Sequence, residues 1–184
     1  SHLFYYYYMN LWHDVPLGDN VPDEFNCIIE IPRGSLNKYE IDKDTGLIML
    51  DRVMYSAQTY PVDYGFAPKT LWDDGDALDV MVITTEPLHP GIVVPVRPVA
   101  IMHMIDDGES DDKVIGVPAN DPRCTHIKDI SDLNQHQLKT LRHYFETYKQ
   151  LQNVEVSISG FEGRDAAIFA VNRSIDLYNK KFSS

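Results

Sequence analysis

The sequence has little cysteine. Only Cys27 and Cys124 occur, far apart in the chain and outside any CxxC pair. A disulfide framework needs several cysteines and a cysteine zinc site needs closely spaced ones, so the pattern indicates neither. None of the seven histidines belongs to an HExxH pair, which argues against a histidine zinc site as well. The sequence therefore predicts two reduced thiols in a cytoplasmic protein.

Long hydrophobic runs are also missing. No segment approaches the roughly 18 consecutive apolar residues of a membrane helix, so we expect no membrane partner. The first residues, SHLFYYYYMN, lack the basic region and the small-residue cleavage site of a signal peptide. Residues 1–8 are predicted to be residues added for expression or a disordered N-terminal segment, and residues 9–184 to form a single domain.

Basic residues are scarce relative to acidic ones. Sixteen Lys and Arg stand against 28 Asp and Glu, which gives a net charge of −12. This charge has the wrong sign for electrostatic attraction to DNA or RNA, so we expect no nucleic-acid partner. The 184 residues contain no Pro/Gly/Ser-rich linker and no repeat, and their number suits one compact domain.

Short β-type runs separated by turn residues occupy the middle of the chain. They cover residues 25–32, 38–42, 46–55, 79–85, 91–105 and 113–118. Strands at this spacing, with prolines at the breaks, predict a small barrel or a strongly curved sheet.

Helical periodicity appears only in the last third of the chain. Residues 133–151 are predicted to contain a helix with Ser131 or Asp132 as N-cap, and residues 164–181 a second helix after Gly163. The apolar face of the first helix is predicted to consist of Leu138, Leu141, Phe145, Tyr148 and Leu151, and that of the second of Ile168, Val171, Ile175 and Tyr178. The fold class is therefore predicted to be α+β, with a β-barrel followed by two helices.

Four carboxylates crowd the segment WDDGDALDVMV, just ahead of an apolar run. Asp74 and Asp76 are two residues apart, so in an extended segment both side chains project to the same side. Two carboxylates about 4 Å apart repel each other by about 4 kcal/mol at an effective dielectric of about 20. Several of them would therefore converge only around a cation, whereas a solvated loop would let them point into water.

A second acidic segment, DDGESDDK, follows another long β run. Two acid-rich loops at strand ends can meet at one end of a barrel, and oxygen-only ligands favour Mg²⁺, Mn²⁺ or Ca²⁺. The spacing does not fit a calcium EF-hand, although a structural calcium site of another kind and an ordinary solvated loop both stay open.

Several cations and tyrosines occur near these acids in an otherwise acidic chain. A set of Lys, Arg and Tyr O–H groups beside metal-binding carboxylates is what a polyphosphate site needs. Each group taken singly is as well explained by a solvated lysine, a surface ion pair or a packed tyrosine. The groups concerned are Lys38, Arg52, Lys113 and Lys149, with Tyr39, Tyr55, Tyr60, Tyr64 and Tyr148.

Several segments of the chain resemble those of a known family. DGDALD (residues 74–79) resembles the acidic Asp-x-Asp-Pro-hydrophobic-Asp motif of the soluble family I inorganic pyrophosphatases, and further blocks resemble that family in the same order. They are IEIPRGSLNKYEID, DRVMYSAQTYPVDYGF, DDGESDDKVIGVP, HIKDISDL and HYFETYKQL. The resemblance covers nearly everything from Val15 to the C-terminus and is specific because the blocks are ordered.

The resemblance implies an OB-like five-stranded β-barrel with flanking helices. It also implies Mg²⁺-dependent hydrolysis of pyrophosphate to two phosphates by direct attack of a metal-bridged hydroxide, with several Mg²⁺ ions per site and Mn²⁺ as a possible substitute. The short prokaryotic type suggests a homohexamer in the cytoplasm.

Carried over residue by residue, the resemblance assigns roles to 15 side chains. Asp76 matches the general base. Asp74, Asp79 and Asp111 match ligands of the activating metals, and Asp106 and Glu30 ligands of the metals that arrive with substrate. Lys38, Arg52, Tyr64, Lys113, Tyr148 and Lys149 match phosphate-binding groups, and Glu40, Tyr60 and Asp107 match supporting positions.

Two positions depart from the family pattern. Ala77 stands where the family usually has proline, which affects loop rigidity rather than ligand chemistry. Phe161 stands near a point where tryptophan is common, and we expect it to pack against the core. Three other functions stay open: an OB-type binding module, which the acidic charge disfavours, a structural calcium protein, and a nucleotide phosphohydrolase, for which the sequence lacks a GxxxxGK[ST] loop.

Overall fold

A computed structural model describes residues 8–183 of the protein. The prediction for residues 1–8 falls, except for Tyr8, outside the described residues. The strands are β1 Phe25–Ile31, β2 Asn37–Ile41, β3 Ile48–Val53, β4 Asp63–Phe66, β5 Asp79–Val82, β6 Val93–Asp106, β7 Glu109–Ser110, β8 Lys113–Pro118 and β9 Val156–Gly163. The helices are α1 Gln135–Thr147 and α2 Arg164–Phe182, with 3₁₀ turns η1 Pro122–Cys124, η2 Ile130–Asp132 and η3 Gln150–Gln152.

Five strands close into a ring. Hydrogen-bonded pairs run β1–β4–β5–β8–β6, and β6 also pairs with β1, which closes the circle. This arrangement confirms the predicted α+β class and the OB-like five-stranded barrel with two main C-terminal helices. The ring pairs are antiparallel except for the parallel pair β5–β8.

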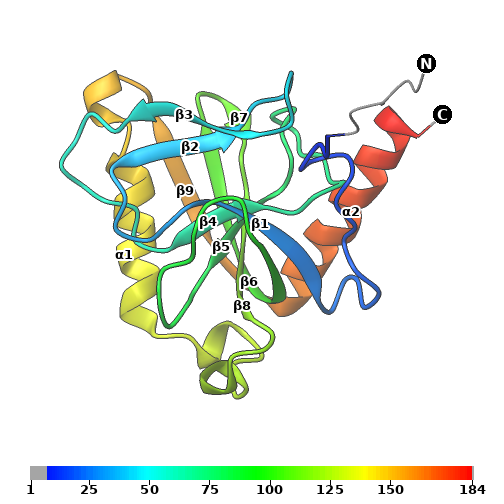
Figure 1. Ribbon diagram of the computed structural model, residues 1–184. Helices are drawn as coiled ribbons and strands as arrows, with labels where there is room; N and C mark the ends of the chain where they lie inside the picture. The colour runs from blue at the N-terminus through cyan, green and yellow to red at the C-terminus, as the bar shows by residue number, and fades with distance from the viewer. Residues whose placement is uncertain (1–7, 184) are drawn as a thin grey trace.

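The identity of the barrel strands differs in part from the prediction. Two predicted strands, residues 38–42 and 46–55, form the separate hairpin β2–β3 beside the ring (Figure 1). The ring contains instead the strand β4, which has only four residues and was not predicted. Gly65 permits this strand to approach β1 closely, because a Cβ there would overlap the carbonyl oxygen of Ile28.

The two main helices lie on opposite sides of the barrel (Figure 1). Leu141 and Phe145 of α1 pack into one core cluster with Ile115, whereas Val171 of α2 packs into another with Val114. Adjacent residues of β8 therefore point to opposite helices, as the two-residue period of a strand requires. Among residues 8–183 no helix is both long enough and apolar enough to cross a bilayer.

The start and end of α1 differ from the prediction. Its N-cap is Asn134, whose side chain accepts hydrogen bonds from the next turn, and not Ser131 or Asp132. Asp132 instead completes a capping box in η2 with Asp129. Leu151 lies in η3 beyond the helix and is 64% exposed, so it is not part of the predicted apolar face.

The second helix agrees closely with its predicted limits. It runs from Arg164 to Phe182, directly after Gly163. Phe161, just upstream in β9, packs against the α1 side of the core. This contact fits a packing role at the position where the family often has tryptophan.

Candidate active site

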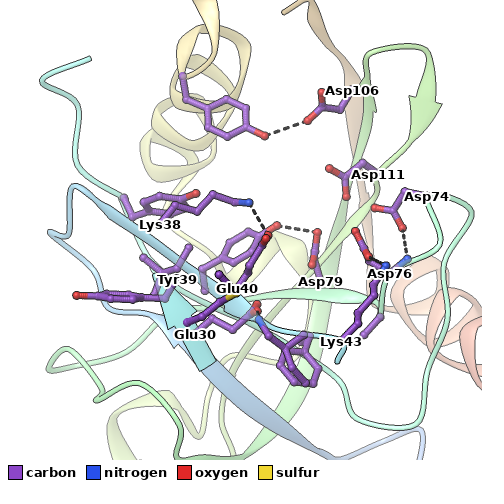
Figure 2. A pocket seen from close by; sticks show the side chains of 18 of the residues that line it. Glu30, Lys38, Tyr39, Glu40, Lys43, Asp74, Asp76, Asp79, Asp106 and Asp111 are labelled. Atoms are coloured by element: carbon purple, nitrogen blue, oxygen red, sulfur yellow. Dashed lines mark hydrogen bonds and ion pairs between the residues drawn. The ribbon is translucent and has the colours of Figure 1, made fainter. Parts of the chain in front are cut away.

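A cavity of about 570 Å³ opens at one end of the barrel, between the β2–β3 hairpin and the end of α1 (Figure 2). Thirteen of the 15 predicted site residues line it. They are Glu30, Lys38, Glu40, Tyr60, Tyr64, Asp74, Asp76, Asp79, Asp106, Asp107, Asp111, Tyr148 and Lys149. The other two, Arg52 and Lys113, do not line the cavity.

Three carboxylates converge on one wall of this cavity. Asp79 is the first residue of β5, Asp111 precedes β8, and Asp74 lies in the loop before β5. One oxygen from each lies within 4.8 Å of the other two, and Figure 2 shows the three side chains pointing toward one another. The two acidic segments of the sequence therefore meet, as predicted, because β5 and β8 are neighbours in the barrel.

Lys113 explains how these acids are held close together. It is paired with Asp79 in the β5–β8 register and is only 1% exposed. Its Nζ lies 2.9 Å from Asp79, 3.1 Å from Asp111 and 2.7 Å from the Tyr64 hydroxyl. Burial alone lowers the pKa of Lys113, but the two carboxylates outweigh burial and raise it. Lys113 is thus a cation behind the carboxylates rather than on the cavity surface.

The pKa values of the three acids show that one buried lysine does not neutralise them. Burial and the neighbouring carboxylates raise the pKa of Asp111 to about 9, although Lys113 opposes the shift. Burial and Asp79 raise that of Asp74 to about 6. Burial also acts to raise the pKa of Asp79, but Lys113 and hydrogen bonds, including one from Tyr64, lower it overall.

The donor set fits a hard divalent cation. All three groups offer oxygen, and burial disfavours their ionised forms unless more positive charge is present. Mg²⁺ and Mn²⁺ prefer carboxylate oxygens together with water, and an open cavity leaves room for water and for a ligand. The side chains of Asp74 and Asp79 converge on Asp111 instead of spreading into solvent, which favours the metal-site interpretation over the solvated loop.

Asp106 and Glu30 also line the cavity. Asp106 accepts hydrogen bonds from the Tyr148 hydroxyl (3.1 Å) and from Lys149 Nζ (2.5 Å). Glu30 is 6% exposed and accepts a hydrogen bond from the Ile41 amide, while burial raises its pKa well above the ordinary value. Neither belongs to the convergent group of three.

The predicted phosphate-binding cations are each paired with an acid. Lys38 Nζ lies 2.7 Å from Glu40 and 3.0 Å from Asp51. Arg52 contacts the same Asp51 oxygen at 2.7 Å and stands beside the cavity. A bound polyanion could draw these side chains away from their acids, because charge-assisted bonds to phosphate are strong.

The tyrosines of the site form a buried cluster along α1. The rings of Tyr60 and Tyr64 lie 5.7 Å apart, and those of Tyr144 and Tyr148 lie 5.6 Å apart. Burial raises the pKa of Tyr64 well above the ordinary value, so its hydroxyl keeps its proton and donates to Asp79 at 2.7 Å. Burial likewise raises the pKa of Tyr148, whose hydroxyl donates to Asp106, so Tyr64 and Tyr148 act as neutral donors.

Asp76 and Asp107 occupy the exposed rim. The side chain of Asp76 is 57% exposed and its carboxylate lies 2.5 Å from Lys43 Nζ. Asp107 has a left-handed backbone with φ of 49° in the β6–β7 turn, and its amide donates to Glu155. Lys43 was not among the predicted site residues, although it directly follows KYEID, the segment that contains the predicted residues Lys38 and Glu40.

Comparisons with known proteins show which family the chain belongs to. Residues 27–179 match the family model described as inorganic pyrophosphatase. The soluble inorganic pyrophosphatase of Oryza sativa subsp. indica is 48% identical over 167 residues, which cover 91% of this chain and 78% of that protein. The inorganic pyrophosphatase of Haloferax volcanii is 47% identical over 176 residues, which cover 95% of this chain and 99% of that protein.

The fold is also found among solved structures. The crystal structure of inorganic pyrophosphatase from Thermus thermophilus aligns with a TM-score of 0.89 and 47% sequence identity. The alignment covers 93% of this chain and 99% of that one.

Proposed function

The chain belongs to the inorganic pyrophosphatase family and is an inorganic diphosphatase, and we propose that it hydrolyses pyrophosphate to two phosphates with Mg²⁺ by direct attack of water. The observation that carries this proposal is the convergence of Asp74, Asp79 and Asp111 in a cavity that also contains lysines and tyrosines. Such a cavity combines metal-binding oxygens with donors for a polyanion.

Asp74, Asp79 and Asp111 would hold the activating Mg²⁺ ions. Asp106 and Glu30, which also line the cavity, would hold ions that enter with the substrate. Bound Mg²⁺ lowers the pKa of a coordinated water and neutralises negative charge on the phosphates. Mn²⁺ would be an acceptable substitute, because it prefers the same oxygen donors.

Asp76 is the proposed general base. It lies beside the convergent acids and its side chain is more than half exposed to the cavity mouth, so it can accept a proton from the attacking water. Attack is direct in this proposal: no Ser, Thr, Cys or His side chain is among the described residues that line the cavity, and the carboxylates are assigned to metal binding, proton transfer and support rather than to nucleophilic attack. No phosphoenzyme is therefore expected.

The cations and phenols would bind the substrate's phosphates. Lys38, Arg52 and Lys149 would donate charge-assisted hydrogen bonds to the phosphate oxygens, joined by Tyr64 and Tyr148. Their present acidic partners keep them near the cavity. Glu40, Tyr60 and Asp107 are proposed to support them through Lys38, the tyrosine cluster and the β6–β7 turn. The predicted phosphate contact of Lys113 would require its buried Nζ to move out from behind Asp79 and Asp111.

We also propose a cytoplasmic homohexamer. The expectation comes from the short prokaryotic type of the family, and exposed apolar side chains such as Phe169 and Leu50 are available for contacts between chains. Light scattering should give the mass of six chains, and a monomeric mass would exclude the hexamer.

The reaction is tested by phosphate release from pyrophosphate with and without Mg²⁺, with ATP as the comparison substrate. The proposal predicts Mg²⁺-dependent release from pyrophosphate and much slower release from ATP. Preference for ATP would indicate a nucleotide phosphohydrolase. Stabilisation by Ca²⁺ without phosphate release would indicate a structural calcium protein.

A further inference from the structure

Lys43 reaches across the cavity mouth from the end of β2 to the acidic loop (Figure 2). Its Nζ lies 2.5 Å from Asp76 Oδ1 and 3.4 Å from the carbonyl oxygen of Gly75. We propose that Lys43 is a positioning residue for the reaction, which holds the carboxylate of Asp76 in place without binding substrate. The inference rests on the role proposed above for Asp76.

The carboxylate of Asp76 has fewer side-chain partners than those of Asp79 and Asp106. The carboxylate of Asp79 contacts both Tyr64 and Lys113, and that of Asp106 contacts both Tyr148 and Lys149. Within residues 8–183, Lys43 is the one side chain that forms a hydrogen bond or ion pair with the carboxylate of Asp76. The orientation of the proposed base is therefore set by this contact.

The Lys43 side chain packs over the buried ring of Trp12. Its Nζ lies 5.9 Å from the ring centroid of Trp12, close enough for a cation–π contact. Trp12 is 4% exposed and donates from Nε1 to the Thr70 carbonyl oxygen at 2.8 Å. The Thr70 hydroxyl in turn accepts from the Leu78 amide at 2.9 Å. Trp12, which the Lys43 ammonium group contacts, is thus hydrogen-bonded to Thr70 at the start of the segment that leads to Gly75 and Asp76.

The loop itself is restrained mainly at its base. The Trp72 amide donates to the Asp76 carbonyl oxygen at 2.7 Å, and Gly75 makes the turn with φ of 84°. Ala77 follows, at a position where the family usually has a proline, whose ring fixes the backbone φ angle. Lys43 restrains Gly75 and Asp76 from outside, at the part of the loop that this chain leaves without that proline.

The ion pair is exposed, which separates its effect on catalysis from its effect on stability. Lys43 and Asp76 are 54% and 57% exposed, and exposed pairs contribute little to folding. A small displacement of a catalytic group, in contrast, lowers kcat strongly, because the reacting atoms are no longer aligned. Loss of the lysine should therefore change turnover while leaving the protein folded.

The test compares Lys43→Met, Lys43→Arg and Lys139→Met in the full chain. Methionine keeps a long side chain over Trp12 but removes the charge, arginine keeps the charge, and Lys139 is an exposed lysine on α1 away from the cavity. For Lys43→Met we expect kcat to fall about tenfold with KM for magnesium pyrophosphate nearly unchanged. Lys43→Arg should recover most of the loss, and Lys139→Met should behave as the parent.

A second readout does not depend on activity. Hydrogen exchange of the amides of residues 73–77 should be faster in Lys43→Met than in the parent and in Lys139→Met, both with and without Mg²⁺. If the parent itself fails to hydrolyse pyrophosphate, the proposed function is wrong while the exchange experiment still tests the contact. A raised KM with unchanged kcat would overturn the proposal in favour of substrate binding by Lys43. Unchanged kcat together with unchanged exchange would overturn it outright.

Discussion

The two sides of the site are built differently. The Asp79–Lys113–Asp111 group sits on the barrel, where the lysine is 1% exposed and the two acids are 18% and 15% exposed. The Asp76–Lys43 pair sits at the mouth, where both side chains are more than half exposed. The first group is fixed by the β5–β8 register, and the second by one contact between a hairpin and a loop.

In the proposed function, this difference would separate metal binding from proton transfer. Of the proposed metal ligands, Asp79 is the first residue of β5 and Asp111 lies two residues before β8, so backbone hydrogen bonds of the barrel fix their positions, whereas Asp74 lies in the loop before β5. The proposed base is placed on a loop, where it meets water. Substitutions in the barrel group should therefore damage folding and metal binding together, whereas substitutions in the loop pair should damage turnover alone.

The largest effect is expected from Lys113→Met. Removing this buried cation leaves Asp79 and Asp111 close together without compensation, which should cost about 3–5 kcal/mol of unfolding free energy and abolish activity. Urea denaturation at neutral pH measures the loss, with Lys139→Met as the control for removing a lysine from the surface. A loss of unfolding free energy below about 1 kcal/mol would mean that the ion pairs of Lys113 with Asp79 and Asp111 contribute little to the stability of the fold.

Asp76→Asn should separate turnover from stability. It removes a proton acceptor from an exposed side chain, so kcat should fall by about 10²- to 10⁴-fold. The unfolding free energy should stay within about 0.5 kcal/mol of the parent. Steady-state kinetics and urea denaturation on the same preparation measure both quantities. Parental kcat would remove the role of base from Asp76.

Ala77→Pro should stiffen the loop that carries Asp76 and leave the barrel group Asp79–Lys113–Asp111 unchanged. None of the described residues accepts a hydrogen bond from the Ala77 amide, and Ala77 does not have positive φ, so proline removes no bond there. The variant should gain about 0.4–1 kcal/mol of stability through a more restricted unfolded chain. Thermal unfolding measures the gain. Destabilisation would show that the loop here has a backbone that proline does not fit.

The smallest effect concerns His103, outside the cavity, whose ring contacts Asp112 at 2.9 Å and Glu162 at 2.5 Å. Burial lowers its pKa, but hydrogen bonds to these acids outweigh burial and raise it. A raised folded-state pKa gives stability that is fully present below the unfolded value of about 6.5 and is lost as pH rises through the folded value.

His103→Gln should therefore cost more unfolding free energy at about pH 5.5 than at about pH 8.5, with a difference below about 1 kcal/mol because the ring is partly exposed. Urea denaturation at the two pH values measures the difference. An equal cost at both would mean that the protonated ring does not stabilise the fold.

The spacing of the acids at strand ends predicted that the two acidic segments can meet, because these are local features, whereas the individual ligands came from the family resemblance. The sequence also predicted α2, which follows a glycine and keeps a clear period. The strand β4 was missed because four residues with a glycine carry no alternation. Leu151 was assigned to a buried face because periodicity does not register the end of α1 at Thr147.

Lys43 was missed for a different reason. Its contacts with Trp12 and Asp76 join three segments that are distant in the sequence, so no local pattern marks them. The position of Lys113 behind the carboxylates, rather than on the cavity surface, follows likewise from the β5–β8 register, which the sequence does not specify.

The most direct measurement is a Mg²⁺ titration of the parent and Asp76→Asn, with phosphate release from pyrophosphate and Mg²⁺ affinity recorded on the same samples. We predict similar Mg²⁺ affinity in both proteins, with turnover dependent on Mg²⁺ in the parent and nearly lost in the variant. Turnover that is independent of Mg²⁺, or a variant that turns over at the parental rate, would contradict the division of roles between the barrel and the loop.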